Sequence, residues 1–208
     1  MRDDSTLGLK LRKANSFRDL CYISLIEAIK SHSLEFGEFQ LASGAISNYY
    51  LDLRSLALSS DGLFWIVFCL HDLLRVEDAG RSIKTEFDAI GGPCIGADPI
   101  VGAFLYNQGR IRNHLRGFLV RKEEKTYGKK SMVIGSVKPG DKVVVIEDVC
   151  STGASLLRAC QLIKEHGCEV VQAISVVDRL AGAARLFDAC GIPYKSILTI
   201  KDLGIDDG

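Results

Sequence analysis

The chain has 208 residues, of which 47% are hydrophobic and 25% are charged, and its 26 Lys and Arg equal its 26 Asp and Glu in number. At roughly 150 residues per domain, this length favours one domain that buries about 70% of its unfolded surface. A formal net charge of 0 excludes a protein that attracts nucleic acid or an anionic membrane over its whole surface. Anion binding must therefore come from a local cluster of residues.

The sequence favours a cytoplasmic chain that does not enter a membrane. Its longest apolar run, residues 63–70, has eight residues, whereas a membrane-spanning helix needs about 20. The first residues, MRDDSTLGLKLRK, mix acids and bases and lack the apolar core of a secretory signal. The seven cysteines are odd in number and contain no C-x-x-C pair, so we expect reduced thiols packed as small apolar residues.

The first third of the chain predicts a helix, an extended segment and a second helix. Apolar residues at helical spacing predict a helix over 17–33, with Ser16 as its N-cap. Residues 36–54 place aromatic and β-branched residues around a Ser-Gly turn, which favours a hairpin or an extended segment. A second helix is expected to be capped by Asp61 and to end near Val76.

From residue 87 onward, predicted strands alternate with predicted helices. We expect strands at 87–91, 115–121, 142–149, 170–177 and 194–200, and helices at 99–108, 154–166 and 181–189. This alternation is typical of an α/β fold with a mainly parallel sheet covered by helices on both faces. In such sheets, ligands bind at the carboxyl ends of the strands.

The segment VVVIEDVCSTGAS, residues 143–155, carries the strongest functional signal. A strand buried on both faces is followed by two carboxylates, Glu147 and Asp148, and by a Ser-Thr-Gly turn that leads into a helix. The N–H groups at the start of that helix, with the hydroxyls of Ser151 and Thr152, can hold a phosphate without a lysine. The two acids can accept hydrogen bonds from sugar hydroxyls. Together these features predict a ribose 5-phosphate pocket.

The same segment has a purely structural interpretation, in which Ser151 only caps the helix and the two acids form a solvated strand end. Adjacent acids at the end of a buried strand are otherwise costly, which favours the pocket. The sequence contains neither G-x-x-x-x-G-K-[ST] nor G-x-G-x-x-G. An NTPase loop and a dinucleotide fingerprint are therefore excluded.

Three further features suit anions. Residues 121–130 hold five cations against two acids, which favours a polyanion site over a solvated charged loop. The glycine-rich turn GGPCIGADP, residues 91–99, exposes N–H groups that can receive a diphosphate, although its glycines can also serve only to permit the turn. The planar guanidinium of Arg179, at the end of an apolar strand, suits a carboxylate, and pairing with Asp178 is the alternative.

These segments resemble those of the orotate phosphoribosyltransferases, which are type I phosphoribosyltransferases of pyrimidine synthesis. Residues 143–155 are similar to the thirteen-residue motif for phosphoribosyl diphosphate (PRPP) in that class, which does not identify the base. Three other segments narrow the resemblance. FGEFQLASGAISNYYLDLR resembles the amino-terminal segment of the orotate enzymes, GFLVRKEEKTYGKK their basic loop, and SVVDR the strand end that presents an arginine to the orotate carboxylate.

The resemblance implies a Rossmann-like sheet with a small amino-terminal hood. We expect a single domain over residues 1–208, with a helix and the hood segment up to about residue 60 and the α/β core from 61 to 208. The implied reaction transfers ribose 5-phosphate from PRPP to orotate, which gives orotidine 5′-phosphate and diphosphate. The resemblance also implies Mg²⁺ bound mainly through PRPP, and a homodimer with shared active sites.

The resemblance assigns a role to each matching residue. Asp148, Lys122 and Lys125 would act at the reacting centre, where the lysines neutralise the departing charge. Arg179 would bind the orotate carboxylate, and Tyr49 and Tyr50 would pack near the base, although an aromatic pair is also typical of a core. The other implied substrate-binding residues are Arg121, Glu147, Ser151, Thr152, Gly153, Ala154, Ser155, Tyr127 and Gly96.

Three residues depart from the family pattern. Ala42 stands where the family has a lysine, Gly96 replaces a second lysine found in many members, and Tyr127 stands where many members have histidine. Two alternatives therefore remain open, a phosphoribosyltransferase for a purine or uracil and a non-catalytic regulator that binds PRPP. The basic loop and Arg179 argue against the first alternative.

Overall fold

The computed structural model of the chain describes residues 14–40, 44, 46–74, 86–123 and 131–205. The contacts between residues divide the chain into two compact units, residues 1–74 and 75–208. The second predicted helix belongs to the first of these units. That the whole chain acts as one domain stays a prediction.

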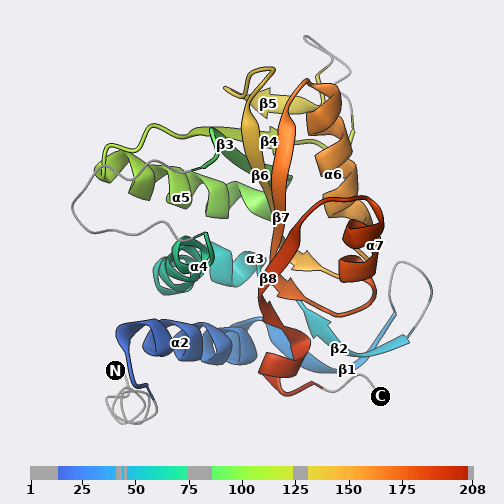
Figure 1. Cartoon of the computed structure of the whole chain (residues 1–208). Helices are drawn as coiled ribbons and strands as arrows, with labels where there is room; N and C mark the ends of the chain where they lie inside the picture. The colour runs from blue at the N-terminus through green and yellow to red at the C-terminus, as the bar shows by residue number, and fades with distance from the viewer. Residues whose placement is uncertain (1–13, 41–43, 45, 75–85, 124–130, 206–208) are drawn as a thin grey trace. The chain divides into compact units, whose positions relative to one another are not determined.

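The amino-terminal unit contains three helices and a hairpin within its described residues (Figure 1). Helix α2 (Phe17–His32) begins after Ser16, whose hydroxyl accepts a hydrogen bond from the Asp19 N–H, as predicted. Strands β1 (Leu34–Gln40) and β2 (Ile46–Leu51) pair in antiparallel fashion, which confirms the predicted hairpin. The short helix α3 (Arg54–Ala57) and the longer helix α4 (Ser60–Leu73) follow, and α3 was not predicted.

The cap of α4 differs from the prediction. The hydroxyl of Ser59 accepts a hydrogen bond from the Gly62 N–H at 3.1 Å, so Ser59 is the N-cap and Asp61 lies in the first turn. A serine oxygen two or three residues before a free N–H satisfies that donor directly, and an acid in the first turn then favours the helix through the macrodipole. The helix ends at Leu73, and the predicted end near Val76 lies outside the described residues.

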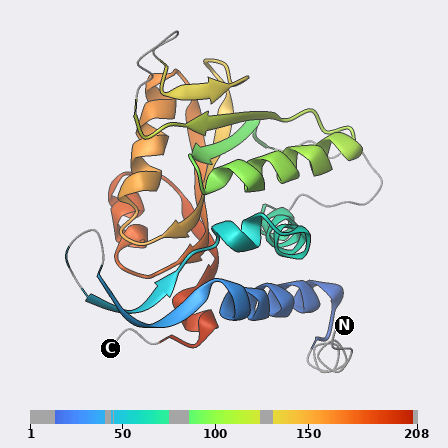
Figure 2. The same ribbon diagram turned by 180° about the vertical axis from the view of Figure 1, so that it is seen from behind.

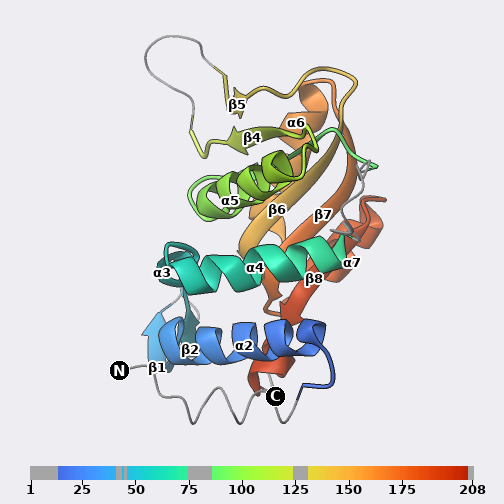
Figure 3. The ribbon, with the colours of Figure 1, turned by 90° about the vertical axis from the view of Figure 1, so that its left-hand side faces the viewer.

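The amino-terminal unit is held together by the packing of α2 on α4, which run side by side in Figure 3. Leu25 and Ile29 of α2 and Ile66 and Leu70 of α4 are fully buried. The carboxylate of Asp72 accepts hydrogen bonds from Arg18 and Tyr22, each at 2.9 Å, and these bonds join the polar edges of the same two helices.

The second unit is built on a six-stranded sheet in the order β5-β4-β3-β6-β7-β8. All neighbouring pairs are parallel except β4 with β5, which confirms the predicted α/β fold with a mainly parallel sheet. The strands are β3 (Ala89–Pro93), β4 (Arg116–Val120), β5 (Val133–Gly135), β6 (Lys142–Cys150), β7 (Glu169–Asp178) and β8 (Tyr194–Thr199). The short edge strand β5 was not predicted, and β3 begins two residues later than expected.

Helices cover both faces of this sheet. Helix α5 (Ala97–Arg110) lies on one face, and α6 (Ala154–Glu165) and α7 (Ala183–Ala189) lie on the other (Figures 1 and 2). A short 3₁₀ helix, η1 (Ile200–Leu203), follows β8. Within the described part of the chain, no helix combines the length and apolar character that crossing a bilayer requires.

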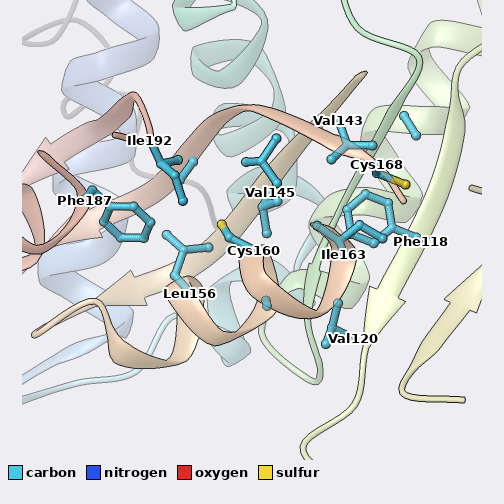
Figure 4. Packing of buried hydrophobic residues seen from close by; sticks show 14 of the residues in the cluster. Phe118, Val120, Val143, Val145, Leu156, Cys160, Ile163, Cys168, Phe187 and Ile192 are labelled. Carbon is cyan, nitrogen blue, oxygen red and sulfur yellow. The ribbon is translucent and has the colours of Figure 1, made fainter. Parts of the chain in front are cut away.

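The core between α6 and the sheet is densely apolar. Figure 4 shows Leu156, Cys160 and Ile163 of α6 directed towards Val143 and Val145 of β6. All five side chains are fully buried, so β6 and α6 are fixed relative to one another by the packing that lies between them. The seven cysteines are free thiols, as predicted, and Cys190 is the exposed one among them.

Phe187 of α7 offers a direct test of this core. Its side chain is fully buried and its ring stacks on Tyr194 with centroids 4.9 Å apart. We expect Phe187→Ala to lower the free energy of unfolding by about 3 to 5 kcal/mol, because it removes a large buried side chain and leaves a cavity. Urea unfolding measures the change. The control is Tyr106→Ala, at a side chain that is 74% exposed, which should change stability by less than about 0.5 kcal/mol. Equal losses in the two variants would contradict the packing described.

Candidate active site

The Ser-Thr-Gly turn, residues 151–153, lies between β6 and α6 and is the predicted phosphate turn. Val144, Val145 and Ile146 of β6 are buried, and the strand ends at Cys150. Gly153 then caps α6 with φ of +88°, without a side-chain hydrogen bond to the helix. Ser151 is therefore not the helix cap, so this part of the structural interpretation is wrong. The turn instead brings the N–H groups at the start of α6 to the carboxyl edge of the sheet, where a phosphate can bind them.

The residue at the centre of the turn has to be glycine for two reasons. A φ of +88° is a left-handed conformation that other residues adopt at a cost. A Cβ at position 153 would also lie 3.2 Å from the Cα of Ala183 and 3.2 Å from side-chain atoms of Leu186 and Phe187. Helix α7 thus supports the turn from below, and the predicted phosphate-binding residues Ser151, Thr152, Gly153, Ala154 and Ser155 share one rigid corner.

The two predicted acids stand at the end of β6 in different environments. The pKa of Glu147 is raised to about 7, mainly because the carboxyl is buried. A hydrogen bond from Ser155 and the charge of Lys122 lower this pKa, and the charge of Asp148 raises it. Asp148 accepts a hydrogen bond from the N–H of Val149 at 2.9 Å. The structure therefore brings Glu147, Asp148, Ser155 and Lys122 together, as the predicted site requires.

The glycine-rich turn after β3 packs directly against these acids. The peptide between Cys94 and Ile95 is cis, and Gly96 is the residue that precedes α5. A Cβ at Gly96 would overlap the carboxylate of Asp148 and lie 2.7 Å from its Oδ2. A Cβ at Gly92 would likewise overlap the carbonyl oxygen of Ile146. Backbone and carboxylate approach this closely only because neither position has a side chain.

The basic segment begins at the end of β4. The N–H of Arg121 donates to the carbonyl of Met132 at 2.9 Å, which continues the pairing of the strand edge. The carbonyl of Lys122 accepts a hydrogen bond from the guanidinium of Arg158 at 3.2 Å. Arg158 was not predicted as part of the site, although it follows Ser155 by three residues on α6 and thus shares its helix face. Lys125 and Tyr127 lie outside the described residues.

Arg179 follows the last residue of β7. Its N–H donates to the carbonyl of Cys150 at 2.8 Å, so its backbone is tied to the end of β6 just before the phosphate turn. Asp178 is 3% exposed and accepts a hydrogen bond from the N–H of Leu180 at 2.7 Å. The assignment of the Arg179 guanidinium to a substrate carboxylate stays a prediction.

A buried polar cluster below the turn was also missed from the sequence. The hydroxyls of Ser175 and Tyr194 lie 2.7 Å apart, and the phenol of Tyr194 lowers the pKa of the nearby Cys150 thiol. Burial raises the pKa of Cys150 to about 12, so this thiol stays protonated at neutral pH. The three residues come from three adjacent strands, and their spacing in the sequence gives no sign of the contact.

The predicted aromatic residues belong to the amino-terminal unit. Tyr49 and Tyr50 lie on β2, where the strand turns successive side chains to opposite faces. Tyr49 is buried, whereas Tyr50 is 41% exposed and its ring lies 5.5 Å from that of Phe39. Their contact with a base stays a prediction, and Ala42 lies outside the described residues.

Most of the chain is similar in sequence to known proteins. A family model described as a phosphoribosyl transferase domain matches residues 116–192. The orotate phosphoribosyltransferase of Rhodopirellula baltica is 39% identical over 189 residues, which cover 91% of this chain and 96% of that protein. The corresponding protein of Corynebacterium glutamicum is 37% identical and the match covers 93% and 99%.

The chain belongs to the orotate phosphoribosyltransferase family. Solved structures of the family share its fold. Mycobacterium tuberculosis orotate phosphoribosyltransferase in complex with PRPP is 32% identical with a TM-score of 0.71, and the match covers 89% of this chain and 99% of that one. The same enzyme in complex with Fe(III) dicitrate gives a TM-score of 0.74 at 34% identity and the same coverage. The sheet is therefore that of a type I phosphoribosyltransferase.

The raised pKa of Glu147 makes stability depend on pH with a defined sign. The carboxyl has a pKa of about 7 in the folded chain against 4.5 ordinarily, so between these values the unfolded chain loses a proton that the folded chain keeps. The free energy of unfolding should therefore fall as pH rises through this interval, by on the order of 2 kcal/mol after solvent screening. Glu147→Gln should remove that fall. Urea unfolding at several pH values from 4.5 to 8 measures both proteins, and parallel curves would contradict the assignment.

Proposed function

We propose that the chain transfers ribose 5-phosphate from PRPP to a ring nitrogen of orotate, which yields orotidine 5′-phosphate and diphosphate. The proposal rests on the corner between β6 and α6, where Glu147, Asp148 and the phosphate turn lie beside the glycine-rich turn that contains Gly96. The bond from C1 of the ribose to the diphosphate oxygen breaks, and a bond from C1 to the orotate nitrogen forms. The sugar passes through an oxocarbenium-like state, as in glycoside hydrolysis.

The protein holds the ribose 5-phosphate from two sides in this proposal. The N–H groups and hydroxyls of residues 151–155 bind the 5-phosphate, and the carboxylates of Glu147 and Asp148 accept hydrogen bonds from the ribose hydroxyls. Charge develops on the sugar and on the leaving diphosphate, so catalysis depends on positioning and electrostatic stabilisation. Few proton transfers are needed.

The diphosphate end requires positive charge from the loops. The turn that contains Gly96 supplies N–H groups, and Arg121, Lys122 and Lys125 neutralise the departing anion. Within the described residues no three His, Cys, Asp or Glu side chains form a metal cluster. We propose that Mg²⁺ binds mainly through PRPP, which leaves few ligands for the protein to supply. Bound in that way, the ion would offset the charge of the diphosphate.

Orotate is the base that we propose, because the similar proteins are orotate phosphoribosyltransferases. Arg179 would bind its carboxylate through a planar guanidinium, with Tyr49, Tyr50 and Tyr127 near the ring. The adenine phosphoribosyltransferase of Leishmania tarentolae is 20% identical, which indicates a shared fold alone. We further propose that the enzyme acts in the cytoplasm as a homodimer in which Lys125 serves the active site of the partner subunit.

The decisive experiment follows the absorbance of orotate with PRPP and Mg²⁺ present. We expect orotate to be consumed and diphosphate to be released in equal amounts, and neither to change when PRPP is omitted. Parallel reactions with adenine, hypoxanthine and uracil test the alternative base. A protein that binds PRPP but releases no diphosphate with any of these bases would instead be a regulator.

Arg179→Leu separates the two substrates. It should raise the KM for orotate at least tenfold and leave the KM for PRPP within about twofold, because a lost charge-assisted bond costs about 1.5 to 3 kcal/mol. The matched control is Arg185→Leu, at an exposed position on α7, which should change neither constant. An equal rise in both constants for Arg179→Leu would contradict its assignment to the carboxylate.

The shared-site dimer is tested by mixing two inactive variants. A Lys125→Ala chain paired with an Asp148→Asn chain puts both defects into one active site and leaves the other intact. Equal mixing gives about half heterodimers, so roughly a quarter of wild-type activity should return. Native mass spectrometry confirms that heterodimers have formed. If activity does not return although they have, both residues act in the same subunit.

A further inference from the structure

Gly96 lacks a side chain for a reason that its backbone does not explain. Its φ of −60° and ψ of −37° are helical values that any residue adopts, so conformational freedom does not require glycine here. The space beside it is instead filled by the carboxylate of Asp148, with which a Cβ at position 96 would overlap. What the position requires is the absence of a side chain.

The backbone on either side of this contact has no room to move. Ala97, Ile100 and Phe104 of α5 are fully buried, so the start of the helix is fixed by its packing. A Cβ at Gly92, in the same turn, would overlap the carbonyl oxygen of Ile146 and lie 2.9 Å from the Cβ of Ala97. The turn therefore already touches β6 through backbone atoms.

The carboxylate of Asp148 is consequently the part that would give way. It is the end of a side chain that can rotate, and its Oδ1 is held by the N–H of Val149 at 2.9 Å. A methyl group at position 96 would break that bond by turning the carboxylate away. The start of α5 would also lose the nearby negative charge that its N–H groups favour.

We propose that Gly96 is a positioning residue for Asp148. Because Gly96 has no side chain, the Asp148 carboxylate can lie between the glycine-rich turn after β3 and the phosphate turn. The inference rests on the proposed function for its catalytic consequence. With PRPP bound as proposed, a carboxylate in this place would lie near both the ribose and the diphosphate, which are joined by the bond that breaks. A longer side chain at this position, such as that of lysine, would need Asp148 to lie elsewhere in this chain.

The first experiment compares Gly96→Ala with Gly102→Ala, the same change inside the helix that Gly96 precedes. A Cβ at Gly102 meets no atom within 4 Å, so that variant should keep wild-type activity and be at least as stable as the wild type. Gly96→Ala should lower kcat at least tenfold and leave the KM for orotate within twofold. Its Tm should fall by no more than about 4 °C, because a rotating side chain accommodates the methyl group. Equal activity in the two variants would overturn the proposal.

A double-mutant cycle then tests whether Gly96 acts through Asp148. Asp148→Asn alone should lower kcat about a hundredfold, as the loss of one charged contact commonly does. If Gly96 acts through that carboxylate, adding Gly96→Ala to Asp148→Asn should lower kcat by less than twofold more. Two effects that multiply in full would show that Gly96 acts independently, and the proposal would be wrong.

A crystal structure of Gly96→Ala tests the same contact without a measurement of activity. The proposal expects the Asp148 carboxylate to rotate away from position 96 and to lose its bond to the Val149 N–H, while α5 and β6 keep their places. Movement of α5 with Asp148 unchanged would overturn it. This result stands even if the wild-type protein consumes no orotate, so failure of the proposed function and failure of the inference remain distinguishable.

Discussion

The place of β6 in the sheet is the constraint on which the site depends. The strand lies between β3 and β7 and is paired with both, and its apolar residues are buried against α6. Backbone bonds on both sides fix its register, with Glu147 opposite Ser175 and Cys150 opposite Asp178. The positions of the two acids and the phosphate turn therefore follow from a strand that is paired on both sides, and a site held in this way would need little rearrangement to bind its substrate.

The charges around β6 are balanced over short distances in a chain whose net charge is zero. The charges of Asp148 and Lys122 act on Glu147 in opposite directions, and burial dominates both. A carboxyl with a pKa of about 7 is partly neutral at physiological pH, which lessens its repulsion of an incoming polyanion. The proposed anion binding would therefore depend on the helix start and a few cations rather than on a basic surface over the whole protein.

Much of this arrangement could be predicted from the sequence because its signals are local. The strand of β6, the acids after it and the glycine of the phosphate turn occupy consecutive positions, so one segment carries the whole pattern. Short strands and the exact start of a helix were harder to predict from the sequence. Strand β5 has three residues and forms only by pairing with β4, and the cap of α4 fell to Ser59 because hydrogen-bond geometry decides between two plausible capping residues.

Contacts between distant segments could not be predicted. They explain why position 96 is glycine, for which the sequence alone gives no reason. Gly96 looks like the loss of a lysine when its turn is considered by itself. In the folded chain the position is closed by Asp148, so a cation there and an acid in this orientation exclude each other. In the proposed reaction, positive charge for the diphosphate would then come from the segment after β4, where Arg121 and Lys122 lie. The balance of charge at the site is thus a property of the three segments together, and a substitution in one of them can be judged only with the other two in place.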